Sequence, residues 1–286
     1  MVASGDPAVL AEPVMLAAFE GWNDAGEAAS AAVDHLWEVW GAQQVAELDP
    51  EEYHDFQVNR PHVGVDDDGR RTITWPTTRI GVATAPSGRQ VVLVHGIEPS
   101  MRWRSYTEEL FEHARRLGVR TVVTLGALLA DVPHTRPIPV TSTTDDEDLL
   151  HRLALERSTY EGPTGIVGVL TESAVSRRLP ALSLWAAVPH YVGQSPSPKA
   201  VLALLGRVED LLGEPVPLAD LADDARAWEH GVDELAGEDA EIGEYVRQLE
   251  QAKDTAELPE ASGEAIAREF ERYLRRRPED GPPGRS

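Results

Sequence analysis

Polar side chains suited to acid–base and anion-binding chemistry recur in this chain, each group directly after an apolar run. They are Trp22, Asn23 and Asp24; Glu98, Arg102 and Trp103; Asp131, His134 and Arg136; Thr171, Glu172 and Ser173; and His190 and Tyr191. Carboxylates beside arginine and histidine can bind a small polar ligand or transfer protons. If the apolar runs are parallel strands, their carboxyl ends share one rim of a sheet, where ligands bind in open α/β folds. The pattern therefore predicts a candidate cleft at that rim.

A structural interpretation of the same residues stays open beside the functional one. Asp24 is followed three positions later by Glu27, which matches a capping box, so we expect a helix to start at Asp24 or within a residue of it. Glu172 could likewise cap a helix, and Arg102 and Arg136 could be ion-pair partners. The residue types alone do not separate these two interpretations.

Several familiar catalytic and metal sites are excluded by missing motifs. The only two lysines, Lys199 and Lys253, do not lie in a P-loop pattern, and G-x-G-x-x-G and H-E-x-x-H are absent. The strand-end segment 94–96 (VHG) is similar to the oxyanion loop of α/β-hydrolases, but the partner motif G-x-S-x-G is missing. The run of aspartates at 66–68 lacks the distal glutamate of an EF-hand loop and is interpreted as a turn. We expect no metal and no cofactor.

The apolar run at 14–19 has the length and composition of a strand buried on both faces, and we predict it to be central. Strands and helices alternate after it, with two hairpins inserted. This alternation predicts a three-layer α/β/α domain over residues 1–213 with a mainly parallel mixed sheet. The expected strands are 14–19, 44–48, 63–65, 71–75, 80–85, 90–95, 119–125, 165–170 and 181–188, and the expected helices are 24–40, 102–117, 145–155, 171–178 and 199–212, with a long loop at 126–139.

The pattern changes after Gly213, where strands cease and much of the excess negative charge is found. Segments 218–235, 240–253 and 262–277 predict three helices, so residues 214–277 form a helical extension. Its apolar stripes favour packing on the α/β body over a free partner-binding arm, because amphipathic stripes are usually core. The segment 278–286 is rich in proline and glycine, and we expect it to be disordered.

Composition restricts the class of partner. The chain of 286 residues has 49 acidic and 26 basic residues and a formal charge of −23, which disfavours nucleic acid and anionic membranes. It contains no cysteine, which excludes disulfides and thiolate chemistry. We recognise no signal peptide and no apolar run near the ~20 residues that span a bilayer. These features predict a cytoplasmic protein.

Six spaced motifs give the chain a family resemblance over nearly its whole length. They are FEGWNDAG (19–26), GIEPSMRW (96–103), TLGALLADVPHTR (124–136), YEGPTG (160–165), LSLWAAVPHY (182–191) and LPEASGE (258–264). In these motifs the chain resembles the proteasome assembly chaperone 2 family in its bacterial branch. The resemblance implies a phosphorylase/hydrolase-like fold with a C-terminal helical extension, and it carries no established activity.

The resemblance bears on partners as well. Some chaperones of this family dock on proteasome subunits through a C-terminal hydrophobic-Tyr-X tail, whereas this chain ends Gly284-Arg285-Ser286. We therefore expect a protein-binding or assembly factor that does not dock through such a tail. The alternative is a small-molecule enzyme of nucleoside phosphorylase or hydrolase type, which rests on fold analogy alone. Apolar surface near Trp103 and Trp185 predicts a homo-oligomer, for which a trimer is one form.

Overall fold

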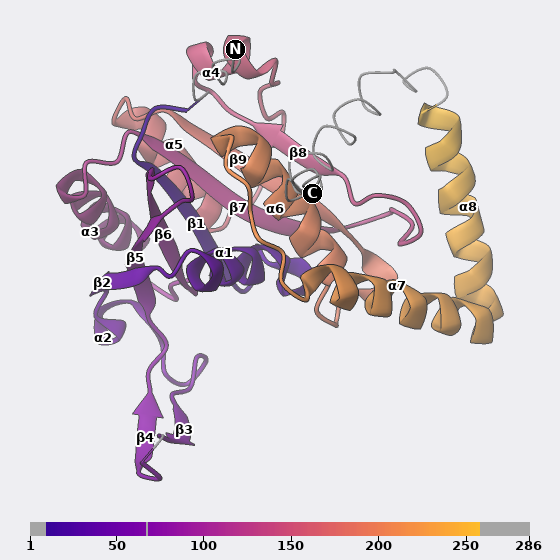
Figure 1. The fold of residues 1–286 in the computed structure, drawn as a ribbon, viewed down its shortest axis with the longest axis horizontal. Coiled ribbons are helices and arrows are strands. Elements are labelled where there is room, and N and C mark those ends of the chain that lie inside the picture. The colour runs from indigo at the N-terminus through magenta and orange to yellow at the C-terminus, as the bar shows by residue number, and fades with distance from the viewer. Residues whose placement is uncertain (1–9, 67, 258–286) are drawn as a thin grey trace, which may run out of the picture.

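A seven-stranded sheet forms the centre of the protein in the computed structural model, which describes residues 10–66 and 68–257 (Figure 1). The central strand β1 (Val14–Glu20) is buried along its length except at Glu20, as its unbroken apolar sequence predicts. The strands lie in the order β2 (Gln43–Glu47), β5 (Thr78–Thr84), β6 (Gln90–Ile97), β1, β7 (Thr121–Ala130), β9 (Ala181–Pro189) and β8 (Val140–Thr143).

The sheet is mixed, with a parallel centre and antiparallel edges. Strands β6, β1, β7 and β9 run parallel to one another, whereas β5, β2 and β8 pair antiparallel to their neighbours. In the register of β1 and β6, Glu20 lies beside Ile97. The carboxyl ends of the four parallel strands consequently lie at one rim of the sheet.

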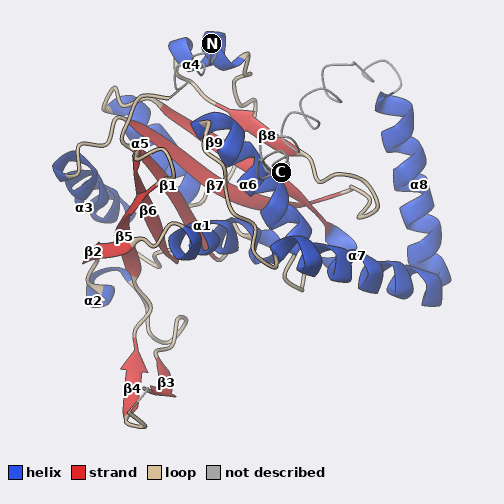
Figure 2. Cartoon of the chain, viewed as in Figure 1, coloured by secondary structure: helices blue, strands red, loops and turns tan. Residues whose placement is uncertain are grey.

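Helices cover both faces of the sheet, so the predicted three-layer α/β arrangement is confirmed (Figure 2). One face packs against α1 (Ala28–Val39) and α6 (Pro198–Leu212), and the other against α3 (Trp103–Arg116) and α5 (Ile166–Ser176). Because side chains alternate along a strand, β1 supplies Val14, Leu16 and Ala18 to the first core and Met15, Ala17 and Phe19 to the second.

The start of the first helix differs from the prediction. Asp24 precedes a single 3-10 turn, η1 (Ala25–Glu27), and α1 begins only at Ala28. Gly26 and Glu27 have φ values of 60° and 51°, and this left-handed backbone interrupts the helix. The predicted capping box is therefore wrong: the Glu27 amide donates to the Asp24 carbonyl at 3.0 Å, but neither side chain makes a cap bond at this turn.

Three further expectations are corrected by the structure. Residues 165–170 do not form a strand, because α5 runs without a break from Ile166 to Ser176. The predicted long loop at 126–139 is shorter, because β7 continues to Ala130. The edge strand β8, at Val140–Thr143, was not predicted at all.

Short elements and one hairpin complete the body. The short helices are α2 (Pro50–Tyr53), α4 (Glu147–Leu153) and η2 (His190–Val192). Strands β3 (His62–Val65) and β4 (Arg71–Thr74) pair in the predicted hairpin, which projects away from the sheet at the bottom of Figure 1. We call this projection, residues 58–75, the hairpin arm.

Two long helices follow the α/β body. Helix α7 (Leu221–Glu238) packs on α6, and α8 (Ala240–Glu257) turns away at the end of α7, at the right of Figure 1. The predicted helix at 262–277 and the tail at 278–286 lie outside the described residues, and the domain division at 213 stays a prediction. Within the part of the chain that the structure describes, no helix is both long enough and apolar enough to cross a membrane.

Candidate functional site

Asn23 and Glu98 meet at the N-terminus of α5. Glu98 Oε1 accepts hydrogen bonds from Asn23 Nδ2 at 2.9 Å and from the Ile166 amide at 2.8 Å, so Glu98 caps this helix from another loop. Gly165 makes the approach possible, because a Cβ there would lie 2.1 Å from Asn23 Nδ2. The carboxylate of Glu98 thus satisfies a helix terminus, and Asn23 holds it there.

Asp24 is buried and organises the start of α1 from outside the helix. Its Oδ1 accepts from the amides of Ala29 at 2.7 Å and Ser30 at 3.1 Å, and its Oδ2 accepts from the Ser30 hydroxyl. Burial raises the pKa of the Asp24 carboxyl, while the bonds from Ser30 and Ala29 oppose that rise. Asp24 therefore does cap α1, as the structural interpretation expects, though by this longer-range route.

The remaining residues after β6 are also held by neighbours. Arg102, whose φ of 56° is left-handed, pairs with Glu52 on α2. Trp103 is half-buried, and its indole donates to the Pro99 carbonyl at 2.5 Å. The Arg102 guanidinium is thus engaged with Glu52, and the Trp103 indole with Pro99.

Thr171 and Glu172 do not lie at a strand end, because the segment before them is helical. The Thr171 hydroxyl on α5 lies 3.0 Å from the hydroxyls of Thr124 and Ser183, under the sheet. Glu172 is exposed on the same helix. These two predicted site residues are therefore separate from the strand-end groups.

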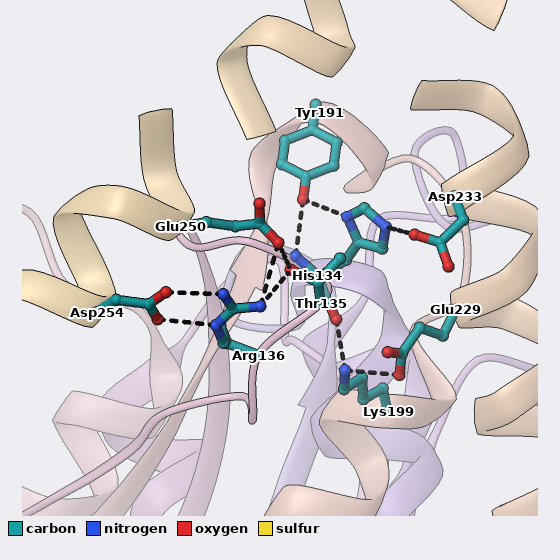
Figure 3. A network of polar contacts seen from close by, with 9 residues as sticks. All are labelled: His134, Thr135, Arg136, Tyr191, Lys199, Glu229, Asp233, Glu250 and Asp254. Carbon is teal, nitrogen blue, oxygen red and sulfur yellow. Dashed lines mark hydrogen bonds and ion pairs between the residues drawn. The ribbon is translucent and has the colours of Figure 1, made fainter. Parts of the chain in front are cut away.

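His134, in the loop after β7, is fully buried and joined to helix α7 (Figure 3). Its Nε2 lies 3.0 Å from Asp233 Oδ1, its Nδ1 lies 2.8 Å from the Tyr191 hydroxyl, and its amide donates to that hydroxyl at 2.8 Å. A neutral imidazole satisfies both ring contacts, with Nε2–H donating to Asp233 and the Tyr191 hydroxyl donating to Nδ1. Burial raises the pKa of Tyr191 to about 12, which keeps that hydroxyl protonated.

The same loop is joined to α8. Arg136 makes a bidentate pair with Asp254, at 2.9 and 2.8 Å, and a third bond to Glu250 at 3.1 Å (Figure 3). Thr135 donates to Glu250 at 2.5 Å. The hydrogen bonds from Arg136 lower the pKa of the Asp254 carboxyl. The expectation that Arg136 is an ion-pair partner fits this geometry.

Asp131 and His190 extend these contacts toward Tyr245. The Tyr245 hydroxyl donates to Asp131 Oδ1 at 2.9 Å, and His190 Nδ1 lies 3.3 Å from the same oxygen. The rings of His190 and Tyr245 meet edge to face with centroids 5.2 Å apart. We call all these contacts from residues 131–136 and η2 to the helices α7 and α8 the loop–helix network.

The predicted strand-end residues thus separate into two groups. Asn23, Glu98, Arg102 and Trp103 surround the ends of β1 and β6, whereas the loop–helix network lies beyond the ends of β7 and β9. An open pocket of about 480 Å³ adjoins the first group and is lined by Glu20, Glu98 and Met101 among others. A larger hollow of about 820 Å³ lies along β8 and residues 154–161, away from both groups.

A third polar cluster, around His95, escaped the sequence analysis. His95 Nδ1 lies 3.0 Å from Asp34 Oδ1 and 3.0 Å from the Arg79 guanidinium, and its Nε2 lies 3.8 Å from Glu20. Burial raises the pKa of Glu20. The residues of this cluster come from four elements, so no spacing in the sequence could reveal the cluster. Among the described residues, no group of three or more His, Asp or Glu is arranged to hold a metal ion.

Exposed apolar side chains occur at the same rim as the polar residues. Backbone pairing of Asp24 with Ala127 brings the loop after β1 alongside β7. Trp22 is 65% exposed, and Met101, Leu128 and Leu129 are 41%, 45% and 49% exposed. We call these four residues the rim surface. Contiguous exposed apolar surface marks interaction sites, so these four residues are a candidate for one.

A family model described as the PAC2 family matches residues 18–236, which span the strand-end loops and most of α7. The chain belongs to the PAC2 family. The resemblance read from the six motifs is thereby confirmed. A comparison with curated proteins found no match.

Solved structures of similar chains support the same assignment. A PAC2 family protein from Streptomyces avermitilis is 58% identical, with a TM-score of 0.78 over 82% of this chain and 100% of that one. The Mycobacterium tuberculosis proteasome-assembly chaperone homologue Rv2125 is 50% identical, with a TM-score of 0.74 and the same coverage. An archaeal proteasome activator, Pyrococcus furiosus PbaB, is 18% identical with a TM-score of 0.63 over 79% of this chain and 94% of that one, and shows the fold alone.

Proposed function

We propose that this PAC2 family protein is a protein-binding factor of the assembly-chaperone type, which holds a partner protein on the rim surface. The observation that carries the proposal is the contrast at the strand ends. There, the polar groups that could do chemistry are engaged within the chain, while Trp22 and Leu128 are exposed. A site of this composition is suited to burying apolar area against another protein.

The partner class is suggested by a relative. The Mycobacterium tuberculosis protein that is 50% identical is described as a proteasome-assembly chaperone homologue, so proteasome subunits are the first partners to test. Subunits of stable assemblies carry apolar interfaces. The rim surface offers them a tryptophan, one of the residue types most enriched at energetically dominant interface positions.

The test is a titration of separately expressed proteasome subunits from the source organism with wild type and a double variant, Trp22→Glu with Leu128→Glu. We expect micromolar or tighter binding by wild type and at least about tenfold weaker binding by the variant. The matched control is Val45→Glu with Leu235→Glu, which places the same charges at two other exposed apolar positions. Equal loss in the control would count against the rim surface.

The enzymatic alternative has a direct assay. Purified protein is incubated with nucleosides and phosphate, and release of the free base is measured with wild type, Arg102→Ala and Glu172→Ala. Because Arg102 is paired with Glu52 and Glu172 lies on α5 away from the strand ends, we expect no release in any of the three. Release that both substitutions abolish would replace the binding factor with a phosphorylase.

A further inference from the structure

The hairpin arm has one apolar face that the rest of the described chain leaves uncovered. In its register Val63 pairs with Ile73 and Val65 with Arg71, while His62 pairs with Thr74 and Gly64 with Thr72. Directly paired residues project on the same face of a two-stranded sheet. Val63, Val65 and Ile73 therefore share one face, which we call the arm's apolar face, and the other face is polar.

This alternation is what a strand with one buried face shows. Yet Val63, Val65 and Ile73 are 59%, 68% and 55% exposed. Trp75, on the same side of β4, is 44% exposed, and its ring packs against the ring of Phe56 at the base of the arm, with centroids 4.9 Å apart. An isolated two-stranded hairpin is only marginally stable in water. The alternation therefore fits an arm whose apolar face is covered by another surface when the protein functions.

The charges on the arm indicate what covers it. Arg71 lies on the apolar face opposite Val65, and Arg60 precedes β3; neither forms an ion pair with any residue that the structure describes. Arg70, by contrast, pairs with Asp68 in the turn. An occupant of the apolar face must therefore offer apolar area beside negative charge, so that the two guanidinium groups gain partners.

A second copy of this chain has both properties. Its acidic surface offers carboxylates to the two guanidinium groups, and it exposes apolar side chains beside carboxylates away from the rim surface, as at Val45 and Glu47 on the edge strand β2. The arm also projects clear of its own body, where a neighbouring molecule can reach it (Figure 1). We propose that the apolar face of the hairpin arm binds the acidic body of a second copy and so holds a homo-oligomer together.

This interface is distinct from the surface that Trp103 and Trp185 first indicated. Trp103 is hydrogen-bonded within its own chain, and Trp185 packs closely over Gly126, where a Cβ would lie 2.6 Å from the indole. The inference goes beyond the proposed function, because self-association through the arm needs no proteasome subunit and leaves the rim surface for a partner.

The test compares two lysine pairs at adjacent cross-strand positions. Val63→Lys with Ile73→Lys charges the apolar face, and His62→Lys with Thr74→Lys charges the polar face; all four positions are exposed, so neither variant should unfold. Light scattering at micromolar concentration should return a multiple of 31.2 kDa for wild type and for the polar-face variant. The apolar-face variant should return a 31.2 kDa particle.

Three results would overturn the proposal. A 31.2 kDa wild type would mean that another protein, or another segment of the same chain, covers the face. A wild-type mass retained by the apolar-face variant would place the interface elsewhere, and equal dissociation by both variants would show a general charge effect.

A further variant, Arg60→Glu with Arg71→Glu, should weaken association, and the difference from wild type should shrink at high salt. Circular dichroism of each variant confirms that the fold is intact. Subunit binding is measured separately, so failure here leaves the proposed function standing.

Discussion

The imidazole Nε2 of His134 lies 3.0 Å from Oδ1 of Asp233, although 99 positions separate the two residues in the chain. The bond joins a fully buried side chain of the body to a half-exposed carboxylate on α7. On the other side of His134, Lys199 of α6 donates to its carbonyl and pairs with Glu229 at 2.7 Å. The loop after β7 is thus one place at which the body holds the helical extension, in addition to the packing of α7 on α6.

Replacing His134 tests the stabilising part of that contact. His134→Ala removes the nitrogen that accepts from the Tyr191 O–H and leaves a cavity, while the main-chain amide still donates to that hydroxyl. The free energy of unfolding should fall by about 1–3 kcal/mol from the unmet hydrogen bond, with a further loss from the cavity. Urea denaturation measures this. The control is His230→Ala, an exposed histidine on α7, which should change stability by no more than about 0.5 kcal/mol. Similar losses in both variants would contradict the buried role of His134.

Substitutions at Asp24 and Glu27 distinguish the observed cap of α1 from the capping box that the sequence predicts. Asp24→Ala leaves the buried amides of Ala29 and Ser30 without their acceptor, and should cost about 1–3 kcal/mol. Glu27 is exposed and its side chain makes no cap bond, so Glu27→Ala should stay within about 0.5 kcal/mol. A capping box would make the two losses comparable. Thermal unfolding followed by circular dichroism decides between the two outcomes.

The pair of Arg136 and Asp254 predicts a pH-dependent position of α8. Because the folded-state pKa of Asp254 is lowered, the pair stabilises the docked helix above the unfolded carboxyl pKa of about 3.9. That contribution is lost as the pH falls through the folded-state value. Helix α8 should therefore be held less firmly in acid than at neutral pH, and Arg136→Gln should loosen it at both, while the bonds of Thr135 to Glu250 and of Tyr245 to Asp131 remain.

The chain contains no cysteine, so a pair of introduced cysteines can carry spin labels for this measurement. Labels at the exposed residues Gln251 on α8 and Thr141 on β8 should give one narrow distance distribution at pH 7, which broadens in acid and in Arg136→Gln. Arg247→Gln removes a pair with Glu244 inside α8 and should change nothing. A distribution that is narrow in every sample would show that the arginine does not hold the helix.

Local patterns predicted most of the body correctly. The apolar run at β1 has the length of a buried strand, and the hairpins at β3–β4 and β5–β6 follow from turn residues between alternating segments. The segment 165–170 failed because a short apolar run does not by itself distinguish a buried strand from the first turns of a buried helix. Only the packing of Ile166, Leu170 and Ala174 on one core shows the helical period.

The candidate site was predicted less well, for a physical reason. The sequence identified His134 and Arg136 as reactive types, but their partners Asp233 and Asp254 lie 99 and 118 positions away. Contacts of that separation depend on how α7 returns along α6, which no local spacing reports. Of the rim surface, Trp22 was among the predicted site residues, whereas Leu128 and Leu129 fell in the predicted loop at 126–139, because the sequence does not show that β7 continues past the core.

The account rests most heavily on the rim surface as a protein-docking site. The direct measurement is the affinity of proteasome subunits for wild type, for Trp22→Glu with Leu128→Glu, and for the control Val45→Glu with Leu235→Glu. We predict that wild type and control bind alike, and that the rim variant binds at least about tenfold more weakly with an unchanged unfolding midpoint. Binding of equal strength by all three proteins, or no binding by wild type at micromolar concentration, would contradict the account.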